Sequence, residues 1–104
     1  MNRVADARAT TGRSRDAQPV PRATLLTTTA CHLCEDAHQE LRRRAERGEL
    51  FLEVVSMESD EGRGLVATHR PAMFPLVLLD GRPLGHGRLS RRRLDAALRL
   101  GEVR

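Results

Sequence analysis

Two cysteines, in the segment Cys31-His32-Leu33-Cys34, stand where the hydrophobic pattern of the chain changes from that of a strand to that of a helix. Before them, residues 23–28 are β-branched and apolar, which predicts a short strand. After them, residues recur at the spacing of one helix face: Cys34, Ala37, His38, Leu41 and Ala45. The position of the pair at this junction constrains fold and chemistry more than its spacing alone does.

A second strand and a second helix follow. The nearly continuous apolar run at residues 50–55 is typical of a buried parallel strand. A helix is expected within residues 60–69, and Pro71 follows as a stop.

A hairpin and a last helix complete the pattern. Asp80-Gly81 lies between the apolar run Leu76–Leu79 and a short strand around Pro83-Leu84, and this dipeptide is a strong hairpin signal. Ser90 can cap a final helix whose core face carries Leu94, Ala97 and Leu98. The order of elements is therefore β-α-β-α-β-β-α, which predicts an α/β fold with a four-stranded mixed sheet.

The charge of the chain is unevenly distributed. Residues 1–22 hold five Arg against two Asp, whereas the rest holds thirteen Arg against twelve acidic residues. We interpret residues 1–21 as a disordered N-terminal tail and residues 22–104 as a single domain that is close to neutral. The net charge of +4 is thus no argument for a nucleic-acid partner.

Composition excludes further classes. Aromatic residues make up only 2% of the chain, too few for a protein that stacks bases on aromatic side chains. No apolar run is long enough to span a membrane, and the N-terminus lacks the apolar core of a signal peptide. We therefore expect a cytoplasmic protein, in which a C-x-x-C pair indicates redox chemistry or metal binding rather than a structural disulfide.

The expected position of Cys31 at a helix N-terminus favours its thiolate. Free N–H groups and the helix dipole stabilise an anion there, so the pKa of Cys31 is expected below the value of about 8.5 for a free cysteine. Cys34 lies one turn further on, shielded beneath the first sulfur, where it can attack a mixed disulfide. A protonated His32 would stabilise the Cys31 thiolate further.

These features resemble the glutaredoxin-like branch of the thioredoxin superfamily, in a poorly characterised group with Cys-His-Leu-Cys. The resemblance rests on residues 31–34, on Phe74-Pro75 before the third strand, and on residues 79–85 in the hairpin. It implies a minimal thioredoxin/glutaredoxin fold. It also implies a cis Pro75 that faces the cysteines and a Phe74 backbone that pairs with the substrate.

The resemblance implies a thiol–disulfide oxidoreductase with Cys31 and Cys34 as catalytic residues. His32, Phe74 and Pro75 would contact the substrate. No cofactor or metal is expected, and the partner would be a protein disulfide or a low-molecular-weight thiol. The protein itself is expected to be a monomer. Conventional glutaredoxins grip glutathione with a Gly-Gly segment followed by acidic residues, which is Gly85-His86-Gly87-Arg88 here, so glutathione is expected to be a poor partner.

Two other functions remain open at this stage. A metal or iron–sulfur carrier could use Cys31, Cys34 and His38, although a closed zinc site needs a fourth ligand. A domain of this fold could also serve only as an interaction module, without catalysis.

Two arginine runs complete the candidate residues. Arg42-Arg43-Arg44 is interpreted as the solvated end of a helix. Arg91-Arg92-Arg93 places cations in the first turn of the last helix, where the dipole disfavours them. This cost suggests an anion-binding role, and a run that simply faces solvent is the alternative.

Overall fold

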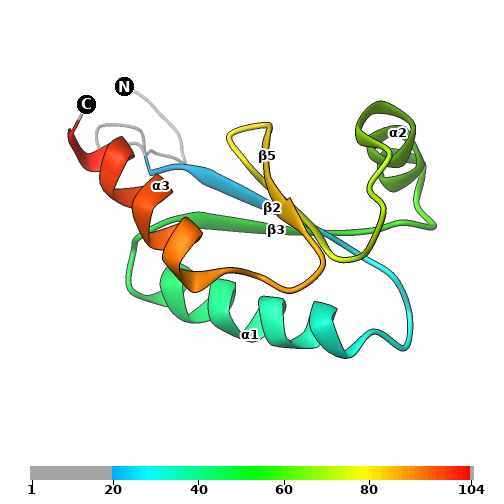
Figure 1. The fold of residues 1–104 in the computed structure, drawn as a ribbon, viewed down its shortest axis with the longest axis horizontal. Coiled ribbons are helices and arrows are strands. Elements are labelled where there is room, and N and C mark those ends of the chain that lie inside the picture. Colours follow the sequence, from blue (N-terminus) through cyan, green and yellow to red (C-terminus); the bar gives the residue numbers. More distant parts are fainter. Residues whose placement is uncertain (1–19, 104) are drawn as a thin grey trace, which may run out of the picture.

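A computed structural model describes residues 20–103, and its helices and strands follow one another in the predicted order (Figure 1). The strands are β2 (Arg22–Thr27), β3 (Phe51–Ser56), β4 (Leu76–Leu79) and β5 (Arg82–His86). The helices are α1 (His32–Glu46), α2 (Asp60–His69) and α3 (Arg91–Val103). The predicted tail, apart from its last two residues, lies outside the described residues.

The four strands form one mixed sheet in the order β3-β2-β4-β5. β2 is parallel to β3, whereas β4 is antiparallel to both β2 and β5. Asp80 and Gly81 connect β4 to β5 with positive φ angles of 51° and 82°, the backbone that a tight hairpin turn requires. The predicted α/β architecture with a four-stranded mixed sheet is confirmed.

Helices cover both faces of the sheet. α1 and α3 pack on one face, where Leu25 of β2 and Val77 of β4 meet Leu41 and Leu94. α2 covers part of the other face, where Leu65 and Val66 pack against a cluster made of Leu26, Val55, Leu76 and Leu78. Neighbouring residues of a strand therefore pack into different hydrophobic clusters, because successive side chains of a strand point to opposite faces of the sheet.

β3 differs from the prediction. Its parallel pairing is confirmed, and Leu52 and Val55 pack into the two cores. It lies at the edge of the sheet, however, and Phe51 and Val54 are 54% and 47% exposed, so the expectation of a buried strand is wrong for these two residues. An apolar run does not distinguish a central parallel strand from an edge strand. The guanidinium of Arg22 lies 4.9 Å from the centre of the Phe51 ring and shields one of its faces.

Arg44 also differs from the prediction. Arg42 and Arg43 are exposed, but Arg44 is buried and so is not part of a solvated helix end. Its guanidinium lies 2.8 Å from Glu40 on the same helix and 2.6 Å from Asp95 on α3. These partners neutralise the cation and allow it to be buried between α1 and α3.

The packing of α2 depends on Gly62. A Cβ atom at this position would lie 1.9 Å from the carbonyl oxygen of Ser56 and 2.8 Å from Cα of Met57. The side chain of Ser59 caps the helix by accepting a hydrogen bond from the N–H of Gly62 over 2.9 Å. The end of β3 and the start of α2 can approach this closely because residue 62 has no side chain.

No helix among the described residues combines the length and the apolar character needed to cross a membrane.

Candidate active site

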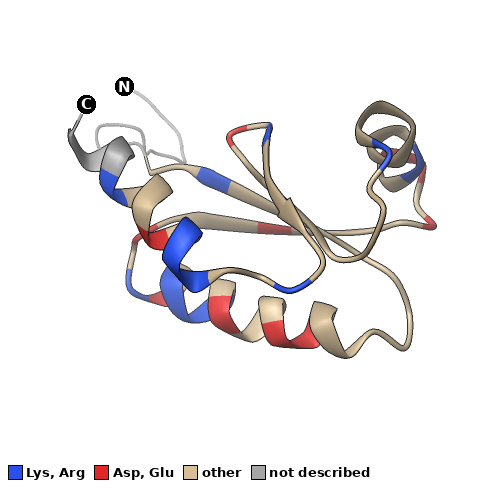
Figure 2. Ribbon diagram, in the orientation of Figure 1, with Lys and Arg blue, Asp and Glu red and all other residues tan. Residues whose placement is uncertain are grey.

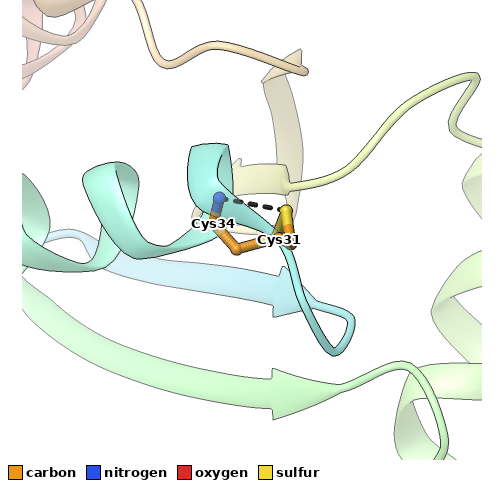
Figure 3. Close-up of a disulfide and its surroundings, with 2 residues drawn as sticks. All are labelled: Cys31 and Cys34. Atoms are coloured by element: carbon orange, nitrogen blue, oxygen red, sulfur yellow. Dashed lines mark hydrogen bonds between the residues drawn. A yellow bond between two sulfur atoms is a disulfide. The ribbon is translucent and has the colours of Figure 1, made fainter.

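Cys31 and Cys34 meet at the N-terminus of α1, directly after the loop that leaves β2 (Figure 3). Cys31 is the N-cap residue with extended backbone angles (φ −125°, ψ 104°), and Cys34 lies in the first turn of the helix. The two residues are joined as a disulfide, with their Cα atoms 5.2 Å apart. The position that the sequence predicts for the pair, between a strand and a helix, is the one observed.

The surroundings of the two sulfur atoms are unequal. The backbone N–H of Cys34 donates a hydrogen bond to Sγ of Cys31 over 3.1 Å. Cys31 is partly exposed, whereas Cys34 is only 4% exposed. Cys31 thus combines access from solvent with a donor that favours its thiolate, and Cys34 has neither advantage.

Phe74 and Pro75 lie at the same end of the sheet as the cysteines. Leu76 pairs with Leu26, the penultimate residue of β2, and the loop from β2 to Cys31 begins next to this pair. The peptide bond between Phe74 and Pro75 is cis, as the resemblance implied. Pro75 is buried and Phe74 is partly buried.

The histidines near the cysteines are placed differently from one another. His32 is exposed in the first turn of α1, and His38 is partly buried further along the helix. No group of three or more potential metal ligands comes together within the described residues. Cys31, Cys34 and His38 therefore do not form a ligand cluster.

Arg91, at the start of α3, faces acidic residues of α1 rather than an open anion site. The guanidinium of Arg91 lies 3.3 Å from Asp36 and 3.2 Å from Glu40, and Figure 2 shows the basic start of α3 above the acidic bands of α1. Arg93 donates to the carbonyl oxygen of Leu84 over 3.3 Å. For Arg91 and Arg93, contacts inside the protein offset the cost of placing cations in this turn, which weakens the argument for an anion-binding role.

Glu40 is the centre of this network. Burial opposes ionisation of its carboxyl group, but hydrogen bonds from Arg43 and Arg44 and the charge of Arg91 outweigh burial and lower its pKa to about 2. Glu40 is not among the candidate residues that the sequence singled out. The four-residue spacing between Glu40 and Arg44 is the signal that could have revealed the pair.

The segment Gly85-His86-Gly87-Arg88 lies beside the cis proline, because the N–H of Gly87 donates to the carbonyl oxygen of Pro75 over 2.9 Å. Together with Ser90 and Arg93 it lines a cavity of about 40 Å³ between β5 and α3. A cavity of this size has room for a few water molecules and is too small to enclose a tripeptide.

The fold and the site define a protein of the thioredoxin-fold class with a C-x-x-C pair at the N-terminus of its first helix. Residues 22–99 match the family described as glutaredoxin-like domain (DUF836). The match covers most of the chain, and the protein belongs to this family. No curated protein matches the sequence.

Solved structures support the same fold. The chain is similar to a structure described as that of a malarial protein, with a TM-score of 0.60 and 15% identity, over 79% of this chain and 97% of that one. It is also similar to the solution structure of an uncharacterised thioredoxin-like protein from Clostridium perfringens, with a TM-score of 0.58 and 15% identity, over 78% and 70% of the two chains. Family membership and the Cys31–Cys34 pair together support a thioredoxin-like redox role in general.

Proposed function

We propose that this protein is a thiol–disulfide oxidoreductase that exchanges disulfides through Cys31 and Cys34. The observation that carries the proposal is the inequality of the two sulfur atoms at one helix N-terminus. Cys31 is accessible and accepts a hydrogen bond from the N–H of Cys34, whereas Cys34 is buried beneath it. Such an arrangement suits one sulfur to attack and the other to resolve.

The proposed reaction moves a pair of electrons between thiols. The Cys31 thiolate attacks one sulfur of a substrate disulfide, the substrate S–S bond breaks, and its other sulfur leaves as a thiolate that takes up a proton. Cys34 then loses its proton and attacks Sγ of Cys31, which releases the second substrate thiol. The substrate is reduced and the protein is left with the Cys31–Cys34 disulfide. The same steps in reverse oxidise a dithiol partner.

Residues around the cysteines would hold the substrate. His32 is exposed next to Cys31, and Phe74-Pro75 lies at the same end of the sheet. These residues are proposed to contact the chain of a protein disulfide on either side of the reacting sulfur atoms. A low-molecular-weight thiol would serve as the second substrate, and no other cofactor is needed for this chemistry.

A single-turnover assay tests the proposal. The reduced full-length protein is mixed with a disulfide-bonded peptide, and the thiols released from the peptide are counted over time. The parent protein should reduce the peptide and finish with the Cys31–Cys34 disulfide, whereas Cys31→Ser should release no peptide thiol. A Cys31→Ser variant that matches the parent rate would overturn the proposal.

A further inference from the structure

The outer edge of β3 is open within the described part of the chain, because the sheet ends there in the order β3-β2-β4-β5. Edge strands are usually protected by a proline, a lysine, a bulge or a covering element. β3 has no proline or lysine, and its register with β2 is regular throughout. Its one charged residue, Glu53, lies 3.3 Å from the guanidinium of Arg22 on the neighbouring strand.

The hydrogen bonds of β3 show which of its backbone groups face outward. Phe51 donates to the carbonyl oxygen of Pro21 and Met57 donates to that of Thr27, each over 2.8 Å. In a parallel ladder, alternate residues of a strand bond to the same neighbour, so the residues between them point their N–H and C=O groups away from β2. The outward residues are Leu52, Val54 and Ser56, and Val54 is the middle one.

We infer that β3 pairs in antiparallel fashion with β3 of a second copy, around a twofold axis at Val54. In this register Val54 lies opposite Val54 of the partner subunit, and Leu52 lies opposite Ser56 of the partner subunit. All three outward residues then exchange hydrogen bonds. The inference goes beyond the proposed redox function and replaces the monomer expected from the sequence.

The side chains of β3 favour the same register. Val54 and Phe51, the exposed large apolar residues of the strand, both gain an apolar neighbour. Val54 meets its own copy, and Phe51 comes opposite Met57 of the partner subunit. A register centred on Glu53 would instead place two carboxylates directly opposite each other, which is unfavourable.

The charges of α1 identify the occupant as a second copy. Asp36 and Glu40 lie on the side of α1 that faces α3. By the helical repeat, Glu35, His38 and Arg42 lie on the other side, toward the β3 edge. Glu35 and Arg42 are both exposed, and neither has an ion-pair partner within the described residues.

This charge pattern is self-complementary around the proposed axis. α1 has 15 residues and β3 has 6, so they are about 22 Å and about 20 Å long. Because α1 connects two parallel strands, it runs back along β3, and its middle near His38 lies close to the level of Val54. The two α1 helices of the pair would be antiparallel, which brings Glu35 of each copy toward Arg42 of the other.

Sedimentation velocity on the full chain, from low micromolar to several hundred micromolar, tests the inference. The parent protein should sediment increasingly as a dimer as its concentration rises. Val54→Lys places two ammonium groups at the axis and should abolish the dimer while it keeps the rate of peptide-disulfide reduction. Ala67→Lys, which adds the same charge on the exposed side of α2, should leave the dimer intact.

A charge exchange tests the contact between the helices. Glu35→Arg and Arg42→Glu should each weaken the dimer, and the double variant should restore it, with a smaller effect at high salt. A parent protein that remains a monomer at the highest concentration would overturn the inference. The β3 edge would then be free to pair with residues 1–19 or with another protein. A Val54→Lys variant that is as dimeric as the parent would overturn it as well.

Discussion

The backbone N–H of Cys34 donates a hydrogen bond to Sγ of Cys31 over 3.1 Å, so the second cysteine of the motif supplies a donor to the first. In the reduced protein this donor would face a thiolate, and a hydrogen bond to a charged acceptor is stronger than one to a neutral acceptor. The donor belongs to the first turn of α1, where free N–H groups add to the same effect. In the proposed reaction, this relationship suits Cys31 to attack and Cys34 to resolve.

Cys31 is accordingly expected to react faster than Cys34 with an alkylating reagent at neutral pH. Iodoacetamide modification is measured against pH on the single-cysteine variants Cys34→Ser and Cys31→Ser. Only the first variant, which retains the exposed N-cap sulfur, should react rapidly. Faster modification of Cys34 would reverse the roles of the two cysteines.

Glutathione is expected to be a poorer partner than a protein disulfide. The segment Gly85-His86-Gly87-Arg88 lines only a small cavity between β5 and α3, and its sequence lacks the acidic residues of conventional glutaredoxins. Turnover in a glutathione-coupled assay should therefore be much slower than with a disulfide-bonded protein. Comparable rates with the two substrates would show that this segment does not limit the reaction with glutathione.

Glu40→Gln should destabilise the protein by about 2 kcal/mol at pH 7, because it removes one of the two carboxylates that neutralise the buried Arg44. The pKa of Glu40 is lowered from 4.5 to about 2, so the carboxylate contributes stability above pH 4.5 and loses that contribution as the pH falls toward 2. The difference in the free energy of unfolding between variant and parent should therefore shrink as the pH falls from 4.5 toward 2. Urea unfolding at several pH values measures this difference.

Glu46→Gln is the matched control for this prediction, since Glu46 lies on the exposed side of the same helix. Its substitution should change the free energy of unfolding by less than about 0.5 kcal/mol at any of these pH values. A stability difference for Glu40→Gln that stays constant down to pH 2 would contradict the ion-pair account.

Gly62→Ala and Gly64→Ala should have opposite effects, although both residues lie in α2. At Gly62 a methyl group would collide with the backbone of Ser56, and we expect a loss of about 3 kcal/mol or more. At Gly64 no atom lies within 4 Å of the added group, and alanine should stabilise the helix by about 0.5–1 kcal/mol. Thermal unfolding of the two variants compares them, and equal effects would contradict the described packing of α2.

Much of the fold could be predicted from the sequence, because local signals agree with the final structure. The change of period at Cys31, the Asp80-Gly81 turn and the cap at Ser90 each act within a few residues, and the structure has the expected element at each of them. The site followed from the same local information, because the strand and helix on either side fix where Cys31 and Cys34 lie.

Features that depend on partners distant in sequence could not be predicted in this way. The apolar run of β3 gives no indication of whether a neighbouring strand lies on one side or on both. Likewise, Arg44 and Arg91 resemble solvated cations until the packing of α3 against α1 brings Asp95, Asp36 and Glu40 to them. Both errors concern contacts that only the assembled sheet and helices create.

Trapping of mixed disulfides, followed by mass spectrometry, identifies the sulfur atom that attacks the substrate. Reduced Cys34→Ser and Cys31→Ser proteins are each incubated with a disulfide-bonded peptide, quenched with acid, and analysed intact and after proteolysis without reductant. We expect a stable mixed disulfide on Cys31 of the first variant, no adduct on Cys34 of the second, and no lasting adduct on the parent, in which Cys34 resolves it. Adducts on Cys34 in the Cys31→Ser protein, with none on Cys31 in the Cys34→Ser protein, would contradict the proposed roles of the two cysteines.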